Sequence, residues 1–186
     1  MKKTKENRSP EEILQGRIEG IQRNREWRRS LLQLLILAAA IYLVFTYILG
    51  FALVRGKSMY PSLKENEILL FYRLDKQYYP GDILIIHMAE NTEYVKRVAA
   101  VEGDVVDIED ETGTLLVNGE PLEEDYIYAQ PTHKISENIS FPLEIGEGEI
   151  FVLGDNREIS RDSREFGCVS FSQVTGRVLL HTGLAF

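Results

Sequence analysis

The chain has 186 residues, about the length of one domain, and a formal net charge of −8. Residues 1–30 hold nine Lys/Arg and five Asp/Glu, a balance of +4, whereas residues 55–186 hold twelve Lys/Arg and twenty-four Asp/Glu, a balance of −12. An acidic body argues against a nucleic-acid partner, because phosphates are bound mainly through Lys and Arg.

The N-terminal part of the chain contains a long apolar run. Ser9, Pro10 and the acids that follow are typical of a helix start, and residues 31–54 then carry no charged side chain. At about 1.5 Å per residue this run is roughly 36 Å long as a helix, enough to cross a bilayer with some tilt. A cleaved secretory signal would instead have an apolar region of about 7–15 residues and a small-residue cleavage site. The sequence therefore predicts one uncleaved transmembrane helix at residues 31–54.

The charges on the two sides of this run predict its orientation. A cluster of arginines directly precedes it: Arg23, Arg25, Arg28 and Arg29. Positive residues next to a span remain on the cytoplasmic side. We therefore expect residues 1–30 to be a basic cytoplasmic segment and residues 55–186 to be an extracytoplasmic domain.

Beyond residue 55 the chain consists of short apolar runs separated by turn residues. Asn118-Gly119 is a strong hairpin signal, because both residues tolerate positive φ. The runs that we expect to form strands are residues 67–72, 83–87, 94–101, 104–108, 114–117 and 150–153. Many short strands with Gly and Pro turns predict a mainly β body.

Two residues of this body suggest nucleophilic chemistry. Ser58 directly follows the apolar run, and Lys96 lies in an apolar strand between Val95 and Val98. A serine hydroxyl becomes a nucleophile when a base takes its proton, and a lysine is such a base only when burial keeps it uncharged. Considered alone, Ser58 is better explained as a turn serine, and Lys96 can be an edge-strand lysine that opposes aggregation.

A third segment, residues 154–167, is dense in polar groups and directly follows a buried-strand pattern. Such a stretch holds either a functional site or an ordinary surface loop in place by hydrogen bonds, and composition does not separate the two. The remaining polar candidates are weaker. His87, His133 and His181 show no metal-ligand spacing, and Cys168, the single cysteine, has no histidine near it in sequence. We expect no metal ion and no other cofactor.

Together, three blocks resemble the bacterial type I signal peptidases, which are membrane-bound serine–lysine proteases. Ser58-Met59-Tyr60-Pro61-Ser62-Leu63 is similar to the nucleophile box, and Tyr94-Val95-Lys96-Arg97-Val98 is similar to the general-base box. The polar segment that begins Gly154-Asp155-Asn156-Arg157 is similar to the long C-terminal box of the family. Order, spacing and the preceding apolar run agree over nearly the whole chain.

The resemblance implies a fold and a set of roles. The fold would be a single transmembrane helix followed by a β-rich, signal-peptidase-like catalytic body with a smaller β insert at about residues 104–150. Ser58 would be the nucleophile, Lys96 the general base, and Ser160 would hydrogen-bond Lys96. Asp162 and Arg164 would form a pair that braces the site, with Asp155 and Arg157 in support.

The resemblance also implies a substrate and a location. The chain would cut signal peptides from secretory preproteins at the bacterial cell membrane, with the lipid bilayer and the signal peptide as its partners. Ala52, Val54 and Val95 would line small apolar pockets for the small residues at positions −1 and −3 of the substrate. An extended substrate could pair with the strand edges beside residues 53–58 and 93–96.

The sequence departs from the family pattern at Gly56, where some members carry a hydroxyl that helps to bind the oxyanion. Two alternatives remain open. Self-cleaving repressor proteases share serine–lysine chemistry but are soluble, which the apolar run argues against. A catalytically silent, membrane-anchored β module that binds peptides has no physical need for Ser58, Lys96 and Ser160 together.

Overall fold

The computed structural model describes residues 10–88, 92–128 and 131–183. Contacts divide the chain into two units, residues 1–45 and 46–186. The first unit is formed by helix α1, Pro10–Leu43, which begins at the proline expected to open it. A short π-helical segment, Val44–Ile48, continues it, and the stretch Gly20–Ile48 is long and apolar enough to cross a membrane.

The apolar run does not end as a helix, and the expected helix boundary at residue 54 was wrong. Leu49–Leu53 form strand β1, which pairs antiparallel with β2, Ile68–Tyr72, over its whole length. An uncharged apolar run suits a lipid-spanning helix and a sheet strand equally, so the tertiary pairing with β2 decides. The uncharged helical part, residues 31–48, is then roughly 27 Å long, close to the about 30 Å of a bilayer core.

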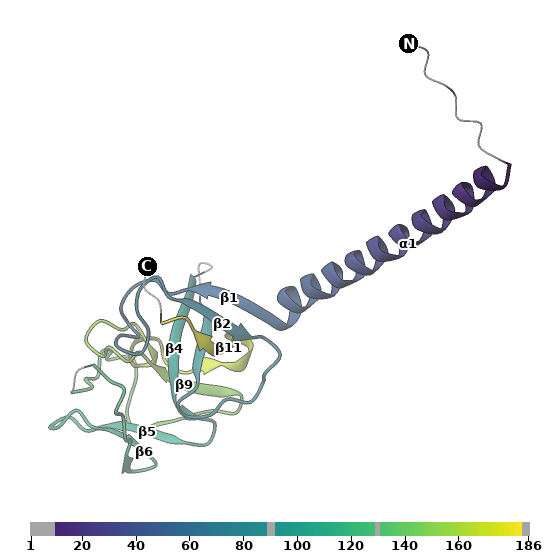
Figure 1. The fold of residues 1–186 in the computed structure, drawn as a ribbon. Coiled ribbons are helices and arrows are strands. Elements are labelled where there is room, and N and C mark those ends of the chain that lie inside the picture. Colours follow the sequence, from purple (N-terminus) through teal and green to yellow (C-terminus); the bar gives the residue numbers. More distant parts are fainter. Residues whose placement is uncertain (1–9, 89–91, 129–130, 184–186) are drawn as a thin grey trace. The chain divides into compact units, whose positions relative to one another are not determined.

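The second unit is built on a seven-stranded antiparallel sheet (Figure 1). Its spatial order is β1-β2-β11-β3-β4-β9-β10. The bounds of its other strands are β3 Ile83–Met88, β4 Thr92–Val101, β9 Glu149–Leu153, β10 Val169–Ser170 and β11 Val174–His181. A one-turn helix α2, Ser163–Phe166, and a 3₁₀ turn, Phe171–Gln173, lie on either side of β10 in sequence.

A smaller sheet forms the expected insert. It has four strands in the order β7-β6-β5-β8, all antiparallel: β5 Val105–Ile108, β6 Leu115–Val117, β7 Glu120–Pro121 and β8 Leu143–Glu144. The predicted turn joins β6 to β7, with φ of 55° at Asn118 and 82° at Gly119. The mainly β body and its insert, behind an N-terminal apolar helix, are therefore confirmed.

Two apolar clusters position the parts of the body that matter below. One joins the two sheets and includes Ala100, Val106 and Phe151. The other lies under the loop after β1 and contains Val54, Met59, Leu63 and Leu69, packed against Val95 of β4. The second cluster brings the loop that carries Ser58 against the strand that carries Lys96.

Candidate active site

Ser58 lies in the loop between β1 and β2, and its neighbours anchor that loop. Met59 and Leu63 are fully buried, and the amide of Leu63 donates to the carbonyl of Met59 at 2.8 Å. The carbonyl of Ser58 accepts a hydrogen bond of 2.9 Å from the amide of Asn156. The backbone at Ser58 is thus fixed by the packing of Met59 and Leu63 in the core and by the hydrogen bond from Asn156, in the segment after β9.

Lys96 meets Ser58 from β4. Its side chain is buried, and Nζ lies 2.9 Å from Ser58 Oγ. Nζ also donates to the carbonyl of Val95 at 3.1 Å and lies 5.4 Å from the centroid of the Tyr94 ring. The structure therefore brings together the two side chains that the sequence singled out.

The surroundings of Lys96 favour its uncharged form. Burial lowers the pKa of Lys96 to about 8, because an ammonium loses its hydration there; the nearby carboxylates of Asp162 and Asp155 oppose this shift, and Arg164 adds to it. At pH 7 about one-tenth of the lysine is then neutral, against about three in ten thousand for an ordinary lysine. A neutral amine next to a hydroxyl can accept its proton.

Ser160 is buried beside this pair but does not make the expected hydrogen bond to Lys96. Among the described residues, its Oγ has no hydrogen-bond partner. A Cβ on Gly154 would come within 2.1 Å of Ser160 Oγ and 2.6 Å of the Ser58 carbonyl oxygen. Ser160 therefore lies against the Gly154 backbone, and only a glycine at 154 permits that approach.

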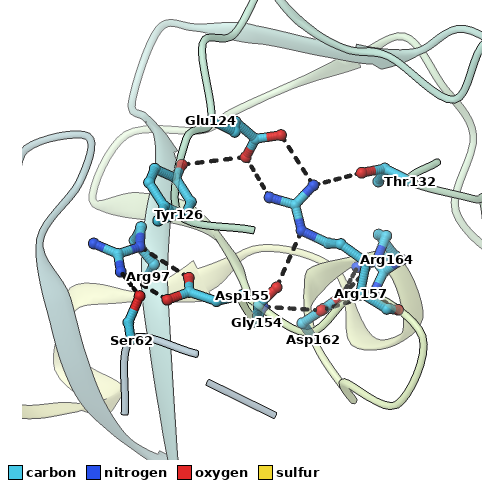
Figure 2. Close-up of polar contacts among 10 residues, drawn as sticks. All are labelled: Ser62, Arg97, Glu124, Tyr126, Thr132, Gly154, Asp155, Arg157, Asp162 and Arg164. Atoms are coloured by element: carbon cyan, nitrogen blue, oxygen red, sulfur yellow. Dashed lines mark hydrogen bonds and ion pairs between the residues drawn. The ribbon is translucent and has the colours of Figure 1, made fainter. Parts of the chain in front are cut away.

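Asp162 and Arg164 form the expected pair, with Arg164 Nε 2.8 Å from Asp162 Oδ1 and both side chains buried (Figure 2). Asp162 also accepts from the amide of Gly154 at 3.1 Å and caps α2 by accepting from the amide of Arg164. Arg164 Nη2 donates to the carbonyl of Arg157 at 2.8 Å. The pair thus holds the segment that lies against Ser58.

Asp155 and Arg157 take partners that were not predicted from the sequence. Asp155 accepts from Arg97 at 2.7 and 2.9 Å, and Arg157 pairs with Glu124 of the insert (Figure 2). Arg97 had a signal, because it follows Lys96 directly in the same block. Glu124 had none, since it lies in an acidic run where only the fold distinguishes one carboxylate from the next.

A cleft of about 740 Å³ opens beside Ser58 and Lys96. The three residues expected to form substrate pockets, Ala52, Val54 and Val95, all line it, although Val54 is almost wholly buried. The other lining residues come from β1, β3, β4 and the loop after β1: Phe51, Leu53, Arg55, Gly56, Met59, Ile85, His87, Thr92, Glu93 and Tyr94. His87, Phe51 and Tyr94 were not singled out from the sequence.

The backbone around the cleft is only partly paired. β4 pairs with β3 from Thr92 onward, but its pairing with β9 begins only at Arg97. β1 is at one edge of the larger sheet, with β2 as its neighbour. Both strands that flank the cleft therefore have an edge on which an extended peptide could form main-chain hydrogen bonds.

Other reactive side chains are far less suited to catalysis. Burial, with a smaller contribution from Glu149, raises the pKa of the Cys168 thiol to about 11, so the thiolate is scarce at neutral pH. Within the described ranges, no group of three His, Cys, Asp or Glu side chains could hold a metal ion.

Comparison with known proteins gives the same family as the three sequence blocks. Residues 25–182 match the family described as "Signal peptidase, peptidase S26". Signal peptidase IB of Staphylococcus aureus is 33% identical over 168 residues, which is 77% of this chain and 85% of the relative. Signal peptidase I of Bacillus caldolyticus is 31% identical over 169 residues, covering 84% and 89%.

A solved structure gives a further similarity. The crystal structure of a signal peptidase I from Enterococcus faecalis is 34% identical and covers 56% of this chain and 98% of its own, with a TM-score of 0.44. The match over residues 25–182 and the identity to the staphylococcal enzyme are sufficient for assignment. The chain belongs to the signal peptidase I family, peptidase family S26.

Proposed function

We propose that this protein is a membrane-anchored serine endopeptidase that removes N-terminal signal peptides from exported preproteins. The observation that carries the proposal is the contact of 2.9 Å between Nζ of the buried Lys96 and Oγ of the half-buried Ser58, two residues that line an open cleft. Ser58 is the nucleophile and Lys96 the general base.

In each half of the reaction, Lys96 takes up a proton and then gives it away. Neutral Lys96 takes the proton of Ser58 as Oγ bonds to the scissile carbonyl carbon, which gives a tetrahedral intermediate with a negatively charged oxygen. The amide of Ser58 is a donor to that oxygen, whereas Gly56 has no hydroxyl to add. The Lys96 ammonium then returns the proton to the leaving nitrogen as the C–N bond breaks, and an acyl ester remains on Ser58. Water then loses a proton to Lys96 and attacks the ester carbon. As the bond between that carbon and Oγ breaks, Lys96 returns the proton to Ser58, and the signal peptide leaves with a new C-terminal carboxyl group.

The cleft suits an extended substrate with small side chains near the cleavage site. An extended signal peptide would pair with the edges of β1 and β4, so that main-chain hydrogen bonds supply affinity. Ala52, Val54 and Val95 line this cleft and would bound small apolar pockets, which suit the small side chains at positions −1 and −3 before a signal-peptide cleavage site.

The N-terminal helix anchors the enzyme in the membrane that holds the signal peptide, which raises their effective concentration. The basic segment before the helix and the acidic body after it support a cytoplasmic N-terminus and an extracytoplasmic cleft. In intact protoplasts, added protease should digest the body and spare a tag at Met1. The reverse protection pattern would show that the orientation is wrong.

The deciding experiment is cleavage of a synthetic preprotein by the purified full chain in detergent, followed by mass spectrometry of the products. We expect one cut after the small residue at −1, and near-background rates for Ser58→Ala and Lys96→Ala, whose losses should not add because the two residues act as one unit. Binding without cleavage by the wild type would favour the silent peptide-binding module. More than a tenth of wild-type turnover in either variant would refute the assignment of the pair.

A further inference from the structure

Glu124 is a carboxylate that lies outside the three family blocks yet is buried next to them. It follows β7 in the insert, and its side chain is only 4% exposed. A buried carboxylate is costly unless charged partners and hydrogen bonds compensate for its lost hydration. Glu124 has both: its two oxygens contact the Arg157 guanidinium, and Oε1 also accepts from the Tyr126 hydroxyl at 3.2 Å (Figure 2).

Through Arg157, Glu124 reaches the backbone that supports Ser58. The Arg157 side chain is 1% exposed, and its Nε donates to the carbonyl of Gly154 at 3.0 Å. Gly154 is thus held at its carbonyl by Arg157 and at its amide by Asp162. Asn156 lies two residues after Gly154, and its amide donates to the Ser58 carbonyl. A shift of this turn would therefore move Ser58.

Through Tyr126, Glu124 reaches the strand that carries Lys96. The guanidinium carbon of Arg97 lies 4.1 Å from the centroid of the Tyr126 ring. The same guanidinium donates to Asp155 and, at 3.0 Å, to Ser62 Oγ in the loop after Ser58. Burial, and secondarily Glu124, raise the pKa of Tyr126, so its phenol keeps the proton that it donates.

We propose that Glu124 is a positioning residue for the Ser58–Lys96 pair. Its carboxylate ties Arg157 and Tyr126 into one buried cluster, and this cluster fixes the 154–157 turn against Ser58 and Arg97 beside Lys96. The inference rests on the proposed peptidase function and deepens it: the insert is a part of the catalytic apparatus, since it supplies the group that holds the pair in contact.

The test is the pH dependence of kcat/KM for Glu124→Gln in the full chain in detergent, from pH 6 to 10. The groups that act on Lys96 are Asp162, Asp155, Arg164 and the Tyr94 ring, and all remain in this variant. Loosening the turn should admit water to Lys96, so its pKa should rise and the acidic limb should move to higher pH. We expect a loss of about 10- to 100-fold at pH 7, as for a small misplacement of reacting groups, and a clearly smaller loss at pH 9.5.

The matched control is Asp110→Asn, which removes the same charge from the same insert. Asp110 pairs with Lys134 at 2.8 Å, but its side chain is 77% exposed, so its profile should equal that of the wild type. Thermal unfolding of each variant shows whether it is folded at the assay temperature. If Glu124→Gln is not, Tyr126→Phe carries the test, because it keeps the ring against Arg97 and loses one hydrogen bond; it should move the limb in the same direction.

The outcomes are distinct. A folded Glu124→Gln with wild-type activity, or with an equal loss at every pH, overturns the proposal, because a smaller folded fraction lowers the rate without moving the limb. An unshifted limb in Tyr126→Phe overturns it when that variant carries the test. Failure of the peptidase proposal is recognised separately. In that case the wild type does not cleave the substrate, or Ser58→Ala also cleaves it.

Discussion

The pH dependence of cleavage tests the chemistry of Lys96 directly. Only the neutral amine accepts the Ser58 proton, so kcat/KM should rise with pH until Lys96 is deprotonated and then level off. With the pKa of Lys96 lowered to about 8 by burial, the rate should increase about tenfold per pH unit up to about pH 7.5 and flatten above about pH 8.5. At pH 7 burial yields about 300-fold more neutral amine than an ordinary lysine would have.

The assay is kcat/KM on a soluble peptide substrate from pH 5 to 11. The control is a variant with all three histidines replaced by Gln, because His87 lines the cleft and an ordinary histidine titrates near 6.5. We expect the same limb in both proteins. If the limb disappears in the histidine-free variant, or if the rate is still rising steeply at pH 10, then a buried, neutral Lys96 is not the base.

Three further predictions follow from the site. Lys96→Met should be inactive but more stable than the wild type at pH 7 by about 1–3 kcal/mol, since below pH 8 the folded wild type holds a poorly hydrated ammonium. This difference in stability should shrink from pH 8 to 10.5, where the unfolded wild type retains the proton that the folded protein has lost. A lower Tm than that of the wild type at pH 7 would contradict this prediction. Gly154→Ala should lose most activity at unchanged KM, because the new Cβ would overlap Ser160 Oγ and the Ser58 carbonyl oxygen; wild-type kcat would show that the turn can yield. A substrate with Leu in place of Ala at position −1 should be cut about 5- to 150-fold more slowly, because overfilling a small pocket costs about 1–3 kcal/mol. Equal rates would show that Ala52 and Val95 do not bound the pocket.

The sequence alone determined the parts of this protein that depend on local pattern. An uncharged run behind a basic segment predicts a membrane-spanning helix, and regular apolar runs separated by Gly and Pro predict a mainly β body. The three blocks around Ser58, Lys96 and residues 154–167 identify the family, because their order and spacing along the chain are visible without a fold. The N-terminal apolar helix, the mainly β body and the family are confirmed by the structure and the comparisons. The membrane orientation and the roles of the individual site residues remain proposals.

Only the tertiary structure decided which groups meet. The apolar run ends as strand β1 because β2 offers it a pairing partner, a contact that no local pattern contains. Ser160 lies against Gly154 and makes no hydrogen bond to Lys96, because the turn after β9 brings these two residues of the same segment together. Glu124 differs from its acidic neighbours only in the partner that the folded insert gives it. Burial and long-range partners, which set the pKa of Lys96 and the place of each carboxylate, arise when distant segments pack together, and a linear sequence does not specify them residue by residue.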